Sequence, residues 1–320
     1  MTDFEKDEIL KQAKSFLHKG NLYKLAIALN TVQKAEIRLL TTEEYVKLYE
    51  TAKNVEGCSP KSMKYYLYVL NRFFGKVNTP VVEITTDHIR KFLDEYMEIN
   101  SVSKVSLDNI RRILSSFFSW LEEENYISKN PVKRIHKIKA IKTVKQAYTD
   151  ENLEILKDNC TCLRDKVIVE LLSSTGMRVG ELVTLNIENV DFERKECLVL
   201  GKGGKQRKVY FDSKTKIHLQ KYLSTRCDKT QSLFVSLLSP YNKLQISGVE
   251  IMLRKLGIRA KVNNVHPHRF RRTLGTKAID KGMPVEQVQI LLGHTKIDTT
   301  MHYAMVDQSN VKASYRKFID

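Results

Sequence analysis

The sequence predicts a mainly α-helical protein with a small antiparallel β-sheet (α+β), organised as two domains. Apolar residues recur at helical spacing through the first half of the 320-residue chain. Short alternating runs separated by turn residues occupy 190–211 and indicate the sheet. Asn130 and Pro131 interrupt the helical pattern, and the basic run that follows them predicts a linker between the two domains.

The composition excludes several classes of protein. With 42% hydrophobic and 28% charged residues the chain suits a globular fold, and 13 Gly and 6 Pro are too few for a collagen-like or low-complexity chain. No apolar run approaches the roughly 18 residues of a membrane-spanning helix. The start, MTDFEKDEILKQ, is acidic and polar where a secretory signal is basic and then apolar. We therefore expect a cytoplasmic protein without membrane contact.

The five cysteines are odd in number and irregularly spaced, and no two form a CxxC pair. Neither a disulfide framework nor a zinc site fits this pattern. The sequence also lacks a cluster of carboxylates, or of His and Cys, that would predict another metal site. We expect reduced structural thiols, no metal and no cofactor.

The charge balance is the first indication of a partner. Lys and Arg number 54 against 37 Asp and Glu, a formal net charge of +17, and most of this excess lies in residues 141–320. A charge of that size favours a polyanionic partner. Nucleic acid is preferred over a membrane surface, because no basic helix has a bulky apolar face. A merely soluble basic protein is the alternative.

The first half divides into an N-terminal helical extension, 1–44, and a small helical bundle, 45–130. Ser59 caps and Pro60 opens one helix, and others follow at about 86–98 and 104–125. Their apolar stripes are Met63, Leu67, Leu70 and Phe74, then Ile89, Phe92, Leu93 and Tyr96, then Ile110, Leu114, Phe117 and Leu121. Other faces carry basic residues that suit phosphate contact and are equally ordinary on a solvated surface: Lys61, Lys64, Arg72, Arg111 and Arg112.

Residues 131–147 form the predicted linker. Its part 131–145 holds six basic residues and no acidic one. A cationic linker can follow a DNA backbone while the two flanking domains hold the duplex, although a charge run is more often simply solvated. The candidate DNA contacts in the linker are Lys133, Arg134, Lys137 and Lys139.

Residues 148–320 form the predicted second domain. A helix over about 163–175 ends at Gly176, and a short helix begins near Val179. The sheet follows, with the glycine-rich loop GKGGK between its last two strands. After residue 245 the pattern is helical again, with Pro284 at the start and Gly293 at the end of one helix. The last residues form a C-terminal tail helix.

Five short segments of this domain hold residues whose chemistry fits together. They are TGMRVGEL (175–182), GKGGKQRK (201–208), HPHRFRRT (266–273), LLGH (291–294) and DTTMHY (298–303). They resemble the catalytic boxes of the tyrosine recombinase, or phage integrase, family, and the resemblance extends from about residue 45 to the C-terminus. It implies a two-domain DNA clamp with a helical, SAM-like core-binding domain and a catalytic domain. The catalytic residues that it implies are Arg178, Lys202, His268, Arg271, His294 and the nucleophile Tyr303.

These residues also fit phosphodiester chemistry by their own properties. The charge of a phosphodiester spreads over two non-bridging oxygens and grows as a nucleophile adds, so the planar guanidinium groups of Arg178 and Arg271 suit the transition state. Tyrosine has a pKa of about 10 and needs an electropositive pocket or a base. The arginines and His268 are expected to supply this to Tyr303, and His294 to donate to a phosphate oxygen.

The loop between the last two strands carries the candidate general acid. The leaving sugar oxygen is strongly basic, and protonation by a positioned acid accelerates its departure by about 10²–10⁴. Lys202 is the candidate, but Lys205, Arg207 and Lys208 crowd the same loop, and all four also suit phosphate clamps. Lys205 and Arg207 are therefore candidate DNA contacts too. Glu181 is expected to position a basic or histidine neighbour and not to bind a metal.

Together these residues predict an enzyme that cleaves and rejoins DNA at specific sites through a 3′-phosphotyrosyl intermediate. Integration or excision of a mobile element is the favoured role, and Xer-type dimer resolution or DNA inversion are alternatives. A type IB topoisomerase would use the same chemistry on one duplex. A non-catalytic DNA-binding regulator would explain the charge and the helices, but it would leave the Arg, Lys, His, Arg, His, Tyr set unexplained.

The partner implied by the resemblance is double-stranded DNA, held by a homotetramer on two recombination sites. We accordingly expect the protein at the nucleoid, and accessory DNA-bending or directionality proteins are compatible with this assembly. After the proposed nucleophile, Val311, Tyr315 and Phe318 form an apolar stripe. The stripe either docks on a neighbouring subunit or packs back on its own subunit.

Overall fold

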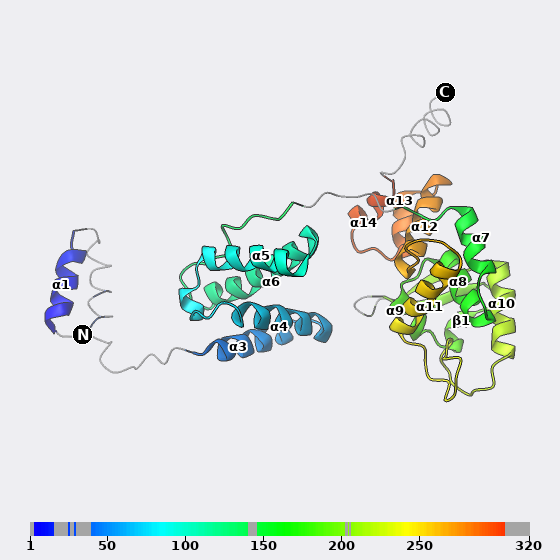
Figure 1. Cartoon of the computed structure of the whole chain (residues 1–320), viewed down its shortest axis with the longest axis horizontal. Coiled ribbons are helices and arrows are strands. Elements are labelled where there is room, and N and C mark those ends of the chain that lie inside the picture. The colour runs from blue at the N-terminus through cyan, green and yellow to red at the C-terminus, as the bar shows by residue number, and fades with distance from the viewer. Residues whose placement is uncertain are drawn as a thin grey trace, which may run out of the picture. The chain divides into compact units, whose positions relative to one another are not determined.

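The computed structural model describes residues 3–15, 25, 29, 40–139, 146–201, 204 and 206–301, together with the backbone of 302–304. The chain divides into two compact units, Met1–Lys142 and Thr143–Asp320 (Figure 1). Both units are mainly helical, and the second contains a three-stranded antiparallel sheet. The predicted fold class is confirmed.

The first unit is built from capped helices. Thr41, Ser59, Thr85 and Ser103 each stand before a helix and accept a hydrogen bond from a backbone N–H of its first turn. Such caps satisfy donors that have no partner within the helix. The helices are α1 (Asp3–Ala13), α3 (Thr42–Val55), α4 (Pro60–Phe74), α5 (Thr86–Asn100) and α6 (Lys104–Glu123), with a 3₁₀ turn at Val81–Glu83.

Aromatic rings fill the core of this unit. Phe73 is fully buried and meets Phe92 edge to face, with the two ring centroids 5.0 Å apart, and Phe117 and Phe118 lie in the same core. In the predicted stripe of α4, Met63 and Leu70 are buried and Leu67 and Phe74 are half-buried, while Phe73, which was not predicted, is fully buried. The physical reason is that α4 packs against both α3 and α6, so its apolar arc is wider than one stripe.

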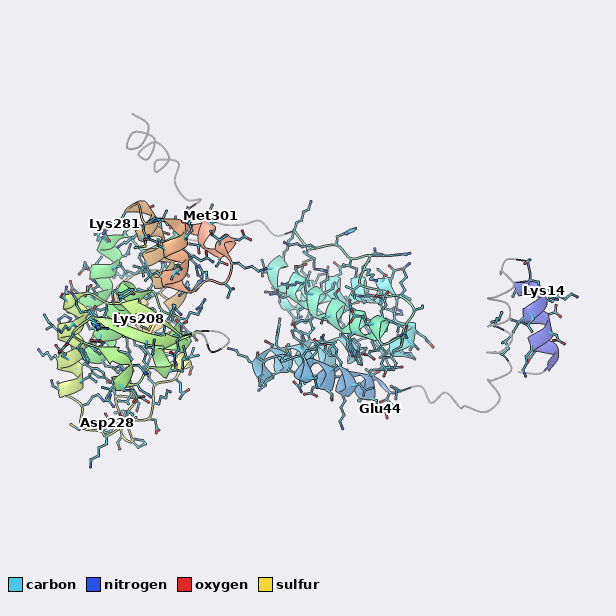
Figure 2. The ribbon with its side chains drawn as sticks, turned by 180° about the vertical axis from the view of Figure 1, so that it is seen from behind. Lys14, Glu44, Lys208, Asp228, Lys281 and Met301 are labelled. Carbon is cyan, nitrogen blue, oxygen red and sulfur yellow. The ribbon has the colours of Figure 1, made fainter. Side chains whose placement is uncertain are left out.

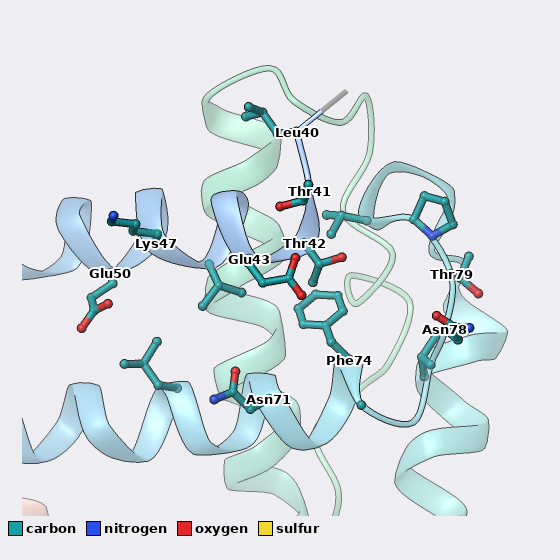
Figure 3. Close-up of a pocket in the computed structure, with 16 residues that line it drawn as sticks. Leu40, Thr41, Thr42, Glu43, Lys47, Glu50, Asn71, Phe74, Asn78 and Thr79 are labelled. Carbon is teal, nitrogen blue, oxygen red and sulfur yellow. The ribbon is translucent and has the colours of Figure 1, made fainter. Parts of the chain in front are cut away.

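A groove of about 950 Å³ lies between the start of α3 and the end of α4 (Figure 3). Two carboxylates, Glu43 and Glu50, line it together with Lys47 and the ring of Phe74. This mixed lining does not offer the cationic surface that a DNA backbone requires. The groove is therefore not part of the candidate site described below.

The first part of the predicted linker belongs to the first unit. Val132 is buried, and its backbone N–H donates to Asn130 Oδ1 at 2.8 Å. Ile135 and Ile138 pack on the core of the unit, and the Ile138 N–H donates to Asp108 Oδ1 at 3.0 Å. The basic run thus begins on a folded surface, although its charge predicted a linker; Val132, Ile135 and Ile138, at every third position, are the residues that pack.

The second unit surrounds a buried helix, α8 (Leu163–Thr175), in which Val167, Ile168, Leu171 and Leu172 have no exposed surface. A helix that is buried along most of its length has to be covered by other elements, and α7, α10 and α12 pack against it. The helices of this unit are α7 (Asp150–Asp158), α8, α9 (Val179–Thr184), α10 (Ser213–Ser224), α11 (Ile246–Arg259), α12 (Pro267–Asp280), α13 (Val285–Leu292) and α14 (Ile297–Ala304).

The sheet of the second unit has the order β1 (Val190–Asp191), β2 (Glu196–Leu200) and β3 (Gln206–Tyr210), with both pairs antiparallel. Val199 pairs with Arg207 and Cys197 with Val209, so these four residues lie on one face of the sheet. That face is turned to the core, because Cys197, Val199 and Val209 are buried. Lys208, labelled in Figure 2, lies on the other face, and its Nζ forms an ion pair with Glu196 Oε1 at 2.6 Å.

All five cysteines are free thiols, as the sequence predicted. Among the described residues, no helix has the length and apolar character needed to cross a lipid bilayer. The same residues contain no group of three or more His, Cys, Asp or Glu side chains arranged to hold a metal ion.

Candidate active site

Arg178 stands at the junction of α8 and α9. The chain turns there through Gly176, whose φ of +60° favours glycine, and a Cβ at this position would lie 2.8 Å from Leu274 Cδ2. The Arg178 backbone N–H then donates to Glu181 Oε2 at 2.7 Å, which closes the first turn of α9. The Arg178 side chain is 41% exposed. This guanidinium is therefore fixed by the turn and still open to a ligand.

Glu181 joins two arginines in the interior of the site. Its side chain is only 5% exposed, and it receives Arg178 Nη1 at 3.0 Å and Arg207 Nη1 and Nη2 at 2.7 and 2.8 Å. Burial by itself raises the pKa of Glu181, but the hydrogen bonds from Arg207 and Arg178 outweigh it and the net pKa lies below the ordinary value. Glu181 thus contacts two basic neighbours, and its role in positioning them stays a prediction.

Three arginines donate to three consecutive carbonyl oxygens where α13 ends. Carbonyls in the last turn of a helix lack a partner within the helix and carry the negative end of its dipole, so cations stabilise them. This helix end thus gathers guanidinium groups from three distant parts of the sequence. The pairs are Arg207 Nε with Leu291 O at 3.3 Å, Arg271 Nη2 with Leu292 O, and Arg178 Nη2 with Gly293 O at 3.2 Å.

Helix α12 carries the HxxR pair. His268 is exposed in its first turn, and Arg271 follows one turn later. Arg271 is 1% exposed, and its Nη1 donates to Gly176 O at 2.9 Å. The structure therefore holds Arg271 as a buried link between the turn before Arg178 and the end of α13.

His294 follows Gly293 and lies among these cations. Burial lowers the pKa of His294 to about 4, and repulsion of a protonated ring by the guanidinium groups of Arg271, Arg178 and Arg207 acts in the same direction. The ring is accordingly neutral at pH 7. Its Nδ1 is 2.8 Å from the hydroxyl of Thr300, a fully buried residue of α14 that the sequence had not singled out.

The side chains of the predicted nucleophile and of the predicted general acid lie outside the described residues. Tyr303 lies in α14, which packs against α12 and α13, but its side chain is outside the described residues. Lys202 and Lys205, in the loop between β2 and β3, are also outside them, as are Val311, Tyr315 and Phe318 of the tail. The assignments of these residues remain predictions.

Arg207 differs from its expected place as an exposed DNA contact. Its side chain is 13% exposed, and both terminal nitrogens bond Glu181. The strand alternation was the signal that predicts this: Val209 and Phe211 point inward, so Arg207, at the same period of two, points inward as well. The basic character of the segment GKGGKQRK predicts a loop that includes Arg207, whereas the strand β3 begins at Gln206.

The basic residues predicted on the first unit are not equivalent. Lys61, Lys64 and Arg112 are exposed on α4 and α6. Arg72 is exposed too, but it lies over the rings of Tyr68 and Tyr96, with its Cζ atom 5.8 and 5.4 Å from the ring centroids. These four residues offer cations at the surface of the unit.

Two further residues of that unit are engaged in ion pairs. Arg111 Nε donates to Asp108 Oδ1 at 2.8 Å, and the two side chains are only 15% and 13% exposed. Lys133 Nζ lies 2.8 Å from Glu122 Oε2. The other candidates of the basic run are exposed: Arg134, Lys137 and Lys139. The pairs leave Arg111 and Lys133 less suited to phosphate contact than the exposed residues.

Comparison with known proteins identifies two families along the chain. The Phage integrase family matches residues 132–310, and the Phage integrase, N-terminal SAM-like domain matches residues 46–128. These ranges contain the arginine cluster of the second unit and the capped bundle of the first. The resemblance seen in the five segments is confirmed.

Relatives extend this match to nearly the whole chain. Tyrosine recombinase XerC of Oceanobacillus iheyensis is 31% identical over 298 residues, 88% of this chain and 95% of the relative. Tyrosine recombinase XerA of Pyrococcus horikoshii is 29% identical over 282 residues, 87% of this chain and 94% of the relative. The fold is similar to that of the XerH site-specific recombinase bound to palindromic difH substrate in a post-cleavage complex, with a TM-score of 0.68, 19% identity, and coverage of 97% of this chain and 94% of that one. The chain therefore belongs to the phage integrase family of tyrosine recombinases, enzymes that cleave and rejoin DNA at specific sites.

Proposed function

We propose that the cations around the end of α13 bind the scissile phosphate and that Tyr303 attacks it. The observation that carries this proposal is the convergence of Arg178, Arg271 and His294 on one helix end, because these groups come from three segments far apart in the sequence. A phosphodiester gains negative charge on its non-bridging oxygens as a nucleophile adds. Fixed guanidinium donors stabilise that charge without reorganising.

The reaction is a transfer between two oxygens. The phenolic oxygen of Tyr303 forms a bond to phosphorus, the bond from phosphorus to the sugar 5′-oxygen breaks, and the tyrosine proton passes to a nearby base, for which His268 is assigned. Lys202 gives a proton to the departing 5′-oxygen. The products are a 3′-phosphotyrosyl bond and a free 5′-hydroxyl. Attack by the 5′-hydroxyl of a partner strand reverses the step and joins the strands.

His294 acts as a neutral donor in this scheme. Its lowered pKa keeps the ring uncharged at pH 7, so it adds a hydrogen bond at the phosphate without adding a further positive charge to the crowded arginines. Arg271, which is 1% exposed in the structure, is assigned to the phosphate in the DNA-bound state. In the absence of DNA it acts by holding Gly176 and Leu292 together.

Covalent capture tests the nucleophile. A library of duplexes with a randomised central segment and a nick is incubated with the full chain, and the nick lets the short cleaved strand diffuse away so that the protein–DNA adduct accumulates. The wild type and the control Tyr241→Phe should form adducts that survive denaturation, whereas Tyr303→Phe should bind the same duplexes and form none. An adduct with Tyr303→Phe would overturn the assignment. Sequencing the captured DNA identifies the site for the later experiments.

A sulfur-substituted substrate tests the general acid. Replacing the 5′-bridging oxygen by sulfur creates a leaving group that departs without a proton, so Lys202→Ala should impair cleavage of the ordinary linkage by about 10²-fold and of the sulfur linkage far less. Equal losses on both linkages would remove Lys202 from the acid role.

The assembly and the biological role are proposed at a coarser level. We propose a homotetramer on two DNA sites, with the tail docked on a neighbouring subunit. Deletion of the residues after Asp307 should then weaken coordinated cleavage more than duplex binding, and unchanged recombination would count against docking in trans.

Integration of a mobile element is the biological role that the sequence favours. The match to relatives named XerC and XerA over nearly their whole length supports dimer resolution as the second candidate. The genomic DNA on either side of the sequence that matches the captured site separates the two roles.

A further inference from the structure

Arg207 is a charged side chain on the apolar, core-facing side of the sheet. Its strand neighbours on the core face are Val199, across the ladder, and Val209, and both are apolar and buried. A guanidinium on an apolar face costs desolvation unless it is fully bonded. Arg207 is bonded, since its Nη1 and Nη2 reach Glu181 and its Nε reaches Leu291 O. These contacts connect the hairpin β2–β3 to two separate elements, α9 and α13.

The carboxylate of Glu181 divides its two oxygens between the same two arginines. Oε1 accepts from Arg178 Nη1 and Arg207 Nη1, and Oε2 accepts from the Arg178 backbone N–H and Arg207 Nη2. The position of the carboxylate therefore fixes the position of Arg178, and Arg207 fixes the carboxylate through a two-pronged contact. Such a planar contact defines an orientation that a single ammonium cannot reproduce.

The segment before His294 is shaped to fit the Arg207 side chain. Gly293 has a φ of +64°, and a Cβ at this position would lie 2.9 Å from Arg207 Cδ and 3.0 Å from its Nε. The oxygen of Gly293 in turn accepts from Arg178 Nη2. Arg207 and Arg178 thus contact the same residue from two sides, and the side chain of Arg207 occupies the space that any residue larger than glycine would need.

We propose that Arg207 is a positioning residue for DNA cleavage, which holds Arg178 in place through Glu181 and anchors the hairpin whose loop carries Lys202 against the end of α13. This inference rests on the proposed function, because it assigns to Arg207 the task of orienting the arginine that binds the scissile phosphate. Arg207 itself does not touch DNA. The sequence predicted a phosphate contact for Arg207, and a positioning residue makes no such contact. A positioning residue also differs from an ion pair that serves folding alone, because its loss affects the catalytic step.

The first experiment separates positioning from phosphate contact. Arg207→Ala is compared with Arg194→Ala, which removes the same charge from the turn between β1 and β2, where the side chain is 73% exposed and its Nε lies 3.9 Å from Asp191 Oδ2. The captured duplex serves as the probe. Arg207→Ala should slow single-turnover cleavage about 10²-fold, a loss typical of a displaced transition-state donor, while its Kd for the duplex stays within about threefold of the wild type. Arg194→Ala should cleave within about twofold of the wild type.

Arg207→Lys sharpens that comparison. It keeps the positive charge but not the two-pronged contact, so it should remain close to Arg207→Ala in cleavage rate. If Arg207 instead contacts a phosphate, Arg207→Ala should raise the Kd and lower the salt dependence of binding by about one counterion, and Arg207→Lys should restore both. That pattern would overturn the proposal.

The second experiment separates positioning from folding. A methylphosphonate at the scissile position lacks one charged oxygen, so an arginine aimed at that oxygen matters less. The penalty of Arg207→Ala should therefore shrink on this substrate by the same factor as the penalty of Arg178→Ala. A purely structural loss would reduce cleavage of both substrates equally and would overturn the proposal.

Glu181→Gln provides a variant of unchanged shape if Arg207→Ala fails to fold, as judged by its thermal unfolding curve. It should reproduce the selective loss on the charged phosphate, and Arg207→Lys in this background should add little further loss, because both changes break one contact. If the wild type forms no covalent adduct, the proposed function falls and this inference with it. If the wild type forms the adduct and both Arg207 variants cleave at its rate, the inference alone falls.

Discussion

The two units hold their basic side chains in different ways. In the first unit Lys61, Lys64 and Arg112 are exposed on helix surfaces, and each acts on its surroundings separately. In the second unit Arg178 and Arg207 share one carboxylate and, with a third arginine, end on consecutive carbonyls. Separate cations contribute additively, whereas groups with shared partners are lost together. We therefore expect the basic residues of the first unit to contribute to DNA affinity independently, and those of the second unit to act through their fixed positions.

The first prediction, which has the largest expected effect, concerns the separate hydrophobic cores of the two units. Phe73→Ala removes a fully buried ring that meets Phe74, Phe92 and Phe118, and it should destabilise the first unit by about 3–5 kcal/mol. Chemical denaturation monitored by hydrogen exchange should show early opening of the first unit and unchanged protection in α8. Phe74→Ala, at the half-buried neighbouring position, should cost less. Parallel loss of protection in α8 would mean that the two units unfold as one.

A pair of glycines tests the geometric requirement. Gly57 and Gly293 have φ values of +81° and +64°, so alanine pays about 1–2 kcal/mol of backbone strain at either position. Around Gly57 there is no atom within 4 Å of an added Cβ, whereas at Gly293 the Cβ would lie 2.9 Å from Arg207. Gly293→Ala should therefore also reduce cleavage about 10²-fold, and Gly57→Ala should leave the cleavage rate at saturating DNA unchanged. Equal cleavage rates for both variants would contradict the expectation that cleavage depends on the close contact between Gly293 and Arg207.

The same contrast explains how much the sequence could predict. Apolar periodicity and capping residues such as Ser59 predicted the helices of the first unit, because these signals are local. The five segments of the second unit predicted which residues are catalytic through family resemblance. They did not predict that Thr300 contacts His294, because this contact depends on which elements pack together. The inward turn of Arg207, by contrast, follows from the period of two of its strand, a local signal. The burial of Phe73 beside Phe74 depends on packing again, since two neighbouring helices decide how wide the buried face of α4 is.

Substitution of exposed basic residues in the first unit should have small effects on DNA binding, and these effects should be additive. Lys64→Ala and Arg112→Ala should each weaken binding of the captured duplex a few-fold and lower the slope of log K against log salt by about 0.9. Cleavage at saturating DNA should not change, because these residues lie outside the unit that holds the arginine cluster. Filter binding at several salt concentrations measures the slopes. Losses that are far from additive in the double variant would show that the first unit also works through a shared network.

The titration of His294 tests the arginine cluster of the second unit through the smallest of the expected effects. Its pKa of about 4 lies below the ordinary value of 6.5, so on acidification the unfolded chain takes up a proton before the folded chain does, and stability falls between about pH 6.5 and 4. NMR of the ring should show no titration near pH 6.5. Arg207→Ala removes one of the cations that disfavour ring protonation, so it should raise the midpoint by less than about one pH unit, while Lys208→Ala should leave it unchanged. A midpoint near 6.5 in the wild type would instead mean that the ring titrates as a solvated histidine and is partly protonated at pH 7, so that neither burial nor the arginines act on its pKa.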